Sequence, residues 1–280
     1  MNCRIKNTLN SYVPKLCRAL AKQAESKSTE TRQACFQLLR ELVVVLRGGL
    51  ETQMELFIPI ISSCLSSTLT DQHQMASSSN IKIEALSFLG VFFRKHAPEA
   101  IHPYCSKLFS LIIQSFADKY YKITSEAFLV CMEFIKTVRP IYYIPESKQY
   151  DIRNIDQDHV PFIKQIYATV LQVLGTSDAD QEVKEKSIVC LGVLLVQVGD
   201  ILQSEQQEAF NVLLERLRNE VTRLISIRTL AVIAQSPIVA GDEFQKCVVT
   251  AVDEATLLLR KNNRSLRIAS LECLCVLISR

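Results

Sequence analysis

The sequence has few turn-forming residues, no tryptophan and no long apolar run. Only 7 of its 280 residues are glycine and 8 are proline, fewer than the many tight turns of a β-sandwich or β-barrel require. Its long apolar stretches, such as Cys190 to Val196, fall far short of the roughly 20 residues that a membrane-spanning helix needs. No apolar segment follows the first residues, so we expect no secretory signal peptide. We also expect no β-sheet and no membrane partner.

The sequence also lacks an excess of either charge and a paired cysteine motif. The net charge of +3 comes from 32 basic and 29 acidic residues, a balance that argues against nucleic acid or a membrane surface as the partner. Nearly all of the ten cysteines lie inside apolar runs, and no Cys-x-x-Cys occurs. Cysteine used in this way is a small core residue, which indicates a reducing compartment. We therefore expect the protein in the cytoplasm and the nucleus.

A helical repeat runs through the whole chain. A small residue followed by a large apolar residue recurs six times, with spacings of 50, 42, 60, 42 and 41 residues. The small residues are Cys35, Ala85, Ala127, Ser187, Thr229 and Ser270. In most repeats apolar residues also lie four before, four after and seven after the small residue, which places them on one stripe of an α-helix. Each recurrence therefore predicts one amphipathic helix in a shared register.

A second helical segment precedes each of these helices. The six preceding segments lie near 11–25, 52–69, 101–117, 159–174, 204–219 and 242–260. Helix pairs at a period near 41 residues are typical of HEAT repeats. We predict an all-α fold, an α-α superhelix of the HEAT or armadillo type, with about six helix pairs in a single array over 1–280. The repeats cover approximately 8–50, 51–98, 99–140, 159–201, 202–239 and 240–280.

Two insertions interrupt the spacing. Residues 70–80 are polar and serine-rich, so we predict a flexible turn there. Residues 141–158 are long for a turn between repeats and carry Tyr142, Tyr143 and Tyr150. Exposed tyrosines are typical of protein contacts, and the alternative is that the three rings pack back onto the repeats.

Two further patterns concern the packing between helices. Gly90 and Gly192 occupy the same position in their repeats, and because glycine destabilises a helix interior, this predicts close approach of another helix. Cations on the second helices and carboxylates in the turns predict a ladder of ion pairs that joins adjacent repeats. The members of this ladder are Arg32, Lys82, Lys184 and Arg267 on the helices and Asp118 and Asp178 in the turns.

No catalytic or metal-binding motif accompanies the repeats. The four histidines, at positions 73, 96, 102 and 159, have no partner at metal-ligand spacing. No phosphate-binding glycine loop and no nucleophile elbow occurs. We therefore predict a protein that is not an enzyme, takes no cofactor and no small-molecule substrate, and acts through its surface.

The second helices carry a charged strip on the side that we expect to be concave. It consists of the residue before the small residue in repeats two to five, namely Glu84, Glu126, Lys186 and Arg228. The sign changes from acidic to basic, which fits a protein partner of complementary charge better than a nucleic acid. The alternative is an ordinary solvated helix surface. These four residues and the three tyrosines are the candidate protein-binding residues.

Six stretches in family order resemble the central part of the cullin-associated, neddylation-dissociated family. They are Lys27–Phe36, Ser77–Leu86, Tyr121–Val130, Asp180–Ile188, Leu214–Leu224 and Leu259–Leu266. Charged turn residues match as well as apolar ones, so the resemblance is more specific than a general HEAT pattern. It implies that the chain is part of a far longer solenoid. An apolar last helix, without the polar outer face of a terminal repeat, agrees with that expectation.

The resemblance implies a non-catalytic scaffold that binds a cullin with its RING-box partner, opposes neddylation and promotes the exchange of substrate receptors. The family's elements for displacing the receptor adaptor lie outside the matched region, so no site residue follows from the resemblance. The alternatives are other HEAT interaction modules, such as a segment of a nuclear transport receptor or a phosphatase scaffold. Lys186 and Arg228 argue against the acidic inner face of a transport receptor, and the lack of tryptophan argues against a tubulin-binding array.

Overall fold

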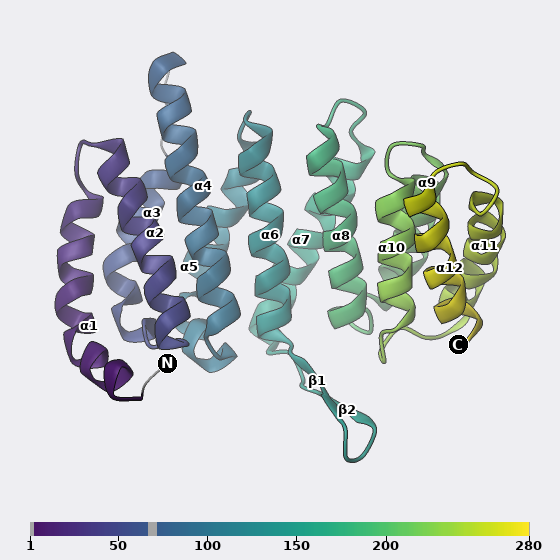
Figure 1. Cartoon of the computed structure of the whole chain (residues 1–280), viewed down its shortest axis with the longest axis horizontal. Coiled ribbons are helices and arrows are strands. Elements are labelled where there is room, and N and C mark those ends of the chain that lie inside the picture. The colour runs from purple at the N-terminus through teal and green to yellow at the C-terminus, as the bar shows by residue number, and fades with distance from the viewer. Residues whose placement is uncertain (1–2, 67–71, 280) are drawn as a thin grey trace. The chain divides into compact units, whose positions relative to one another are not determined.

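The computed structural model describes residues 3–66 and 72–279 (Figure 1). Within these ranges the chain forms twelve α-helices, four short 3-10 helices and one two-stranded sheet. The chain divides into two compact units, Met1–Thr137 and Val138–Arg280, and each contains three of the predicted helix pairs. The prediction of an all-α fold built from paired helices is confirmed for the described part of the chain.

The first unit consists of two layers of helices (Figure 1). One layer contains α1 (Cys3–Ala24), α3 (Met54–Leu65) and α5 (Pro98–Gln114). The other contains α2 (Thr29–Leu46), α4 (Gln72–Lys95) and α6 (Tyr121–Val138). Helices contact their neighbours within a layer; for example, α2 contacts α4. They also contact helices of the other layer; for example, α1 contacts α2. Each pair therefore buries its apolar stripes against its own partner and against the next pair.

Phenylalanine rings from four helices form the core of the first unit. Phe88 on α4 lies 6.1 Å from Phe36 on α2 and 6.3 Å from Phe57 on α3, measured between ring centroids. Phe93 on α4 lies 5.4 Å from Phe134 on α6. All five rings are at most 1% exposed, and burial of each stabilises the fold by roughly 1.5–3 kcal/mol. The apolar residues that repeat along the sequence thus pack into one continuous core in this unit.

The second unit repeats the two-layer arrangement. One layer contains α7 (Val160–Gly175), α9 (Gln206–Arg218) and α11 (Asp242–Leu258). The other contains α8 (Gln181–Val198), α10 (Arg223–Ala234) and α12 (Arg264–Ile278). Side-chain caps fix two of these helix starts: Asp180 accepts a hydrogen bond from the Glu182 amide, and Asn263 accepts one from the Leu266 amide. Such caps satisfy amides that have no partner inside the helix.

Close helix approach is confirmed at one of the two repeat glycines. A Cβ atom at Gly192 would lie 2.4 Å from Cγ2 of Thr229, so α8 and α10 meet where only glycine fits. A Cβ atom at Gly90 would lie 3.8 Å from Cγ2 of Val130, which is ordinary van der Waals contact. The sequence predicted such an approach at both glycines, and the structure requires glycine at Gly192 alone of the two.

The ion-pair ladder forms at one rung. Lys82 on α4 lies 2.7 Å from the Asp118 carboxylate in the turn before α6, and the Lys82 side chain is largely buried. Lys184 instead donates to the carbonyl of Ser177 within its own repeat, and Arg32 donates to Sγ of Cys64 at 2.9 Å. Of these three helix cations, only Lys82 therefore binds a predicted turn carboxylate, and the other two donate to different groups.

The predicted flexible turn at 70–80 is wrong where the structure describes it. Residues 72–80 belong to α4, while residues 70 and 71 lie outside the described residues. The segment contains glutamine, methionine and alanine but no glycine or proline, and serine is only slightly weaker than these as a helix former. Its polar composition was therefore a poor guide to its conformation.

The expectation of no β-sheet is wrong in the second insertion. Strands β1 (Ile141–Ile144) and β2 (Gln149–Ile152) form an antiparallel hairpin, with Tyr143 opposite Tyr150. Isoleucine and tyrosine favour strands, and Lys148 in the connecting turn adopts a left-handed backbone with φ of 54°. The hairpin is an addition to the helical layers rather than a replacement for a helix pair.

Candidate protein-interaction surface

The acidic half of the predicted strip, Glu84 and Glu126, already has interaction partners. Glu84 on α4 lies 3.2 Å from the Arg40 guanidinium of α2 and accepts a hydrogen bond of 2.9 Å from the Gln37 amide. Glu126 on α6 is half-buried and also interacts with a neighbouring group. Both carboxylates therefore already have interactions within the protein.

The basic half of the strip is more open. Lys186 on α8 is half-buried and Arg228 on α10 is exposed. They occupy equivalent positions on neighbouring helices of the second unit, and within the described residues neither forms an ion pair. Unneutralised cations at such positions are suited to meet a carboxylate on a partner. The two acidic members and the two basic members belong to different units, so the role of the strip as a whole stays a prediction.

The three tyrosines project from the hairpin into solvent. Tyr142, Tyr143 and Tyr150 are 52%, 53% and 46% exposed. The rings of Tyr143 and Tyr150 lie 5.2 Å apart across the two strands, and the guanidinium of Arg153 lies 5.9 Å from the Tyr142 ring. Of the two arrangements that the sequence left open, the structure has the exposed one. An exposed aromatic cluster of this kind is typical of protein contact surfaces.

A buried arginine anchors the base of the hairpin. The Nε–H of Arg139 donates to the carbonyl of Arg153 at 3.1 Å, and its guanidinium forms a two-pronged ion pair with Asp200. Burial alone would raise the pKa of Asp200, but the hydrogen bonds and charge of Arg139 hold the pKa of that carboxyl below its usual range. The hairpin is thus fixed at its base by Arg139, while its tyrosines are exposed to solvent.

The last helix carries an exposed apolar row. Ile268, Leu271 and Ile278 of α12 are 45%, 52% and 75% exposed, and their spacing places them along one side of the helix. This agrees with the sequence expectation that α12 lacks a polar outer face. The row is an exposed apolar surface of the second unit in addition to the hairpin.

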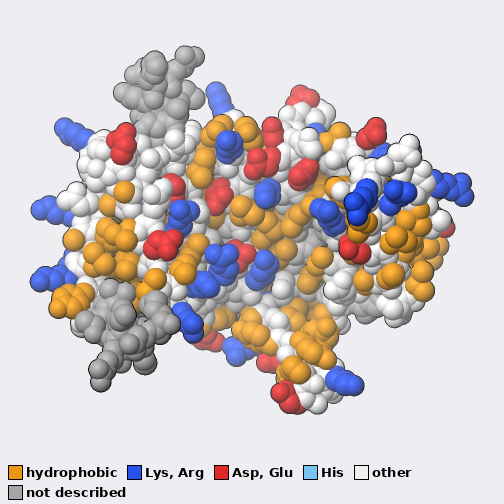
Figure 2. All heavy atoms as spheres, viewed as in Figure 1, with side chains coloured by type: hydrophobic (Ala, Val, Ile, Leu, Met, Phe, Trp, Pro, Cys, Tyr) orange, Lys and Arg blue, Asp and Glu red, His pale blue; other side chains and the backbone are white. Residues whose placement is uncertain are grey.

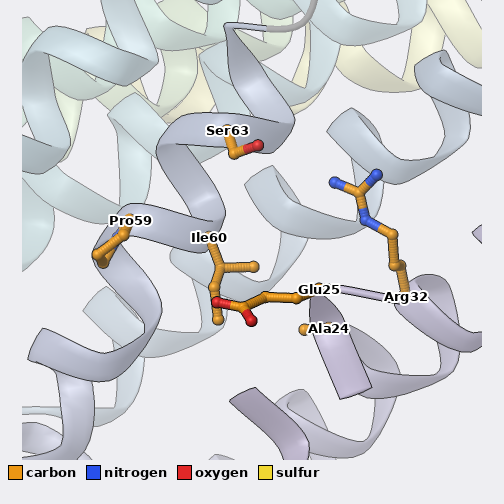
Figure 3. Close-up of a pocket in the computed structure, with 6 residues that line it drawn as sticks. All are labelled: Ala24, Glu25, Arg32, Pro59, Ile60 and Ser63. Carbon is orange, nitrogen blue, oxygen red and sulfur yellow. The ribbon is translucent and has the colours of Figure 1, made fainter. Parts of the chain in front are cut away.

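Two shallow pockets lie between helix ends, one in each unit. Figure 3 shows the pocket of the first unit, which is lined by Arg32 of α2, by Ile60 and Ser63 of α3 and by Glu25 just after α1. Its volume is about 240 Å³, less than the roughly 300–1,000 Å³ of ligand sites. The pocket of the second unit, about 320 Å³, lies between two turns and is lined by Arg223 and Lys261 among others. No feature of the sequence had been interpreted as this pocket.

Eight of the cysteines and two of the histidines, His96 and His159, are buried in the core. Burial raises the pKa of Cys17 to about 11 and that of Cys273 to about 12, so both thiols stay protonated near neutral pH. Buried His96 receives a hydrogen bond from the Leu50 amide at 3.2 Å. Within residues 3–66 and 72–279, no three His, Cys, Asp or Glu side chains are arranged to hold a metal ion. None of the described helices combines the length and apolar character that crossing a membrane requires.

Comparison with known proteins shows which protein family the chain is similar to. Residues 48–191 match the family model described as "CAND1-like, TPR repeats". Cullin-associated NEDD8-dissociated protein 1 of Drosophila melanogaster is 36% identical over 94% of this chain, and its Arabidopsis thaliana counterpart is 35% identical over 97%. The alignments cover 20% and 21% of those proteins, so the chain spans about a fifth of their length.

Solved structures with the same fold are helical-repeat proteins. A designed armadillo repeat protein matches 92% of this chain and 98% of its own with a TM-score of 0.55 and 13% identity. The karyopherin Kap121p, bound to the extreme C-terminus of the phosphatase Cdc14p, matches 96% of this chain and 27% of its own with a TM-score of 0.67 and 13% identity. At such identities the likeness concerns the fold alone, and it supports the α-α superhelix of the HEAT or armadillo type predicted from the sequence.

Proposed function

Because the chain belongs to the CAND1-like family, we propose that it is part of a non-catalytic scaffold that binds cullin–RING complexes. The observation that carries this proposal is the 33–36% identity to proteins named as cullin-associated, over 94–97% of this chain. In this proposal the partners are a cullin and its RING-box protein. The scaffold opposes neddylation and promotes exchange of substrate receptors, in the cytoplasm and the nucleus.

The described surface supports binding through many modest contacts. Lys186 and Arg228 present positive charge on the α8–α10 layer, and the hairpin presents Tyr142, Tyr143 and Tyr150. Tyrosine contributes large contact area at low entropic cost. Stacked repeats sum such contacts over successive helix pairs and flex slightly to fit a large partner. No cofactor takes part in this mechanism.

A pull-down with purified components tests the proposal. The chain is immobilised and incubated with unmodified and with neddylated cullin–RING complex. We expect retention of the unmodified complex and clearly reduced retention of the neddylated one. Equal retention of both would contradict the opposition to neddylation, and retention of neither would contradict binding by this segment.

Charge-reversal variants then locate the contact. The double variant Lys186→Glu/Arg228→Glu should weaken retention while helix content stays unchanged. The matched control is Lys164→Glu/Lys246→Glu, which makes the same change in net charge on α7 and α11, where both lysines sit in exposed ion pairs. Exposed pairs contribute only about 0–1 kcal/mol, so this control should fold normally. If both double variants retained equally less of the complex, Lys186 and Arg228 would be ordinary solvated surface residues and not a specific contact.

The alternative is a protein-interaction module of another HEAT protein, such as a nuclear transport receptor or a phosphatase scaffold. The likeness to Kap121p concerns the fold at 13% identity, whereas the likeness to cullin-associated proteins extends to 36% identity. The cullin-binding proposal is therefore the better supported of the two.

A further inference from the structure

A pocket opens between two turns of the second unit. The α9–α10 turn and the start of α10 supply Glu220, Arg223 and Leu224, and the α11–α12 turn and the start of α12 supply Lys261, Asn262, Asn263 and Leu266. We call this the turn pocket. Its volume is about 320 Å³. Buried Leu266 and half-buried Leu224 give it an apolar floor, while its rim is polar.

Positive charge gathers around the turn pocket without matching acid. Residues 255–271 contain four cations and no acidic residue. Those cations are Arg260, Lys261, Arg264 and Arg267, and all four are exposed. Within the described residues none of them forms an ion pair. Figure 2 shows several of the Lys and Arg side chains of this region close together over α10 and α12.

Two acids of α9 and α11, the helices that precede these turns, are committed to other partners. Glu254 lies 2.6 Å from Arg218, and Glu215 lies 2.8 Å from Arg216. Glu220 is the single carboxylate among the lining residues of the turn pocket. Arg223 donates to the carbonyl of Arg218 at 3.3 Å, a neutral acceptor that leaves its charge uncompensated. The pocket therefore has a positive field that an incoming carboxylate would satisfy.

We propose that the turn pocket is a docking site for an acidic segment of a partner protein, in which carboxylates meet Lys261 and Arg264 and an apolar side chain enters over Leu224 and Leu266. Charge complementarity selects the acidic partner. The apolar floor favours a peptide over a nucleic acid. The cations also form one compact group around two turns, whereas a phosphate backbone needs an extended basic track. The side-chain amide of Asn262 adds a neutral hydrogen-bond donor at the rim.

This inference does not depend on the cullin-binding proposal. It names the chemistry of the docked segment and not the protein that supplies it. A cullin-binding surface on the α8–α10 layer and an acidic-segment site at the turns use different residues, so failure of one leaves the other standing.

Fluorescence anisotropy on the whole chain tests the site. The probe is a labelled peptide of glutamates with interspersed leucines, titrated at low ionic strength. The double variant Lys261→Glu/Arg264→Glu should bind it about tenfold more weakly, because two attractive contacts become repulsive ones. Both side chains are exposed, so the variant should keep the helix content of the wild type, which circular dichroism checks.

Three controls decide the outcome. Lys15→Glu/Arg18→Glu on α1 makes the same change in net charge at exposed positions of the first unit and should bind the peptide as the wild type does. A glutamine-for-glutamate version of the peptide should bind far more weakly than the glutamate peptide. A labelled oligothymidylate should also bind more weakly. The proposal is overturned by no binding of the glutamate peptide, by equal losses in the two double variants, or by an oligothymidylate that binds as tightly as the peptide.

Discussion

Alanine at Gly192 and alanine at Gly90 should change stability in opposite directions, although the two glycines are equivalent in the repeat. A new Cβ atom at Gly192 would lie 2.4 Å from Cγ2 of Thr229, more than 1 Å inside the roughly 3.5–4.0 Å of an ideal carbon–carbon contact. Thr229 is 6% exposed, and its β-branched side chain has little freedom to turn away. At Gly90 the nearest atom, Cγ2 of Val130, is 3.8 Å from the new Cβ.

The magnitudes follow from two competing effects. Replacing glycine by alanine inside a helix stabilises it by about 0.5–1 kcal/mol, and this effect should dominate in Gly90→Ala. Overpacking of a filled contact costs about 1–3 kcal/mol, so Gly192→Ala should be destabilising by up to about 2.5 kcal/mol net. Urea unfolding followed by far-ultraviolet circular dichroism measures both.

A rescue variant isolates the clash. Thr229→Ser removes the Cγ2 methyl that the new Cβ would strike and keeps the hydroxyl. The double variant Gly192→Ala/Thr229→Ser should therefore be more stable than the sum of its two single variants predicts. If Gly192→Ala were as stabilising as Gly90→Ala, or if serine at 229 gave no rescue, the close approach of α8 and α10 would be refuted.

Three further outcomes follow from buried polar groups. Lys82→Met should lose about 1–3 kcal/mol of stability in urea unfolding, because its buried ion pair leaves a carboxylate behind, while Lys107→Met, at an exposed pair of 3.7 Å, should lose less than about 0.5 kcal/mol. Burial lowers the pKa of His96 below 6.5, although the hydrogen bond to the Phe92 carbonyl and the charge of Glu51 act to raise it. As the pH falls, the unfolded chain therefore takes up a proton on this histidine before the folded chain does. The free energy of unfolding should decrease from about pH 7.5 to about pH 5.5 in the wild type, and much less in a His96→Gln variant. Arg139→Ala should speed amide exchange throughout the hairpin, measured by mass spectrometry, and unchanged exchange would show that the hairpin does not depend on this anchor.

The helix pairs could be predicted from the sequence because their signal is local. The stripe that contains Phe36 and Phe134 repeats at helical spacing, so each segment reports its own conformation. The hairpin was missed for the opposite reason. Its strands have four residues each, too few for an alternating pattern to be distinguished from an ordinary loop, and the tyrosines could only be assigned to solvent once Tyr143 and Tyr150 were paired.

The candidate site was less predictable because it depends on distances between helices. The helical spacing predicts Glu84 as a charge on an open helix face, but the packing of α2 on α4 brings Arg40 within 3.2 Å of it. The turn pocket had one visible signal, the four cations without an acid over 255–271. That signal was hidden by the balanced charge of the chain as a whole, and only the meeting of two turns places Arg223 beside Lys261.

Hydrogen–deuterium exchange of the chain, with and without unmodified cullin–RING complex, tests the account most directly. We expect slower exchange in the hairpin at 141–152 and in α8 and α10 when the complex is added, with α7, α9 and α11 unchanged. Protection confined to α7, α9 and α11, or no protection anywhere at a saturating concentration of the complex, would contradict it.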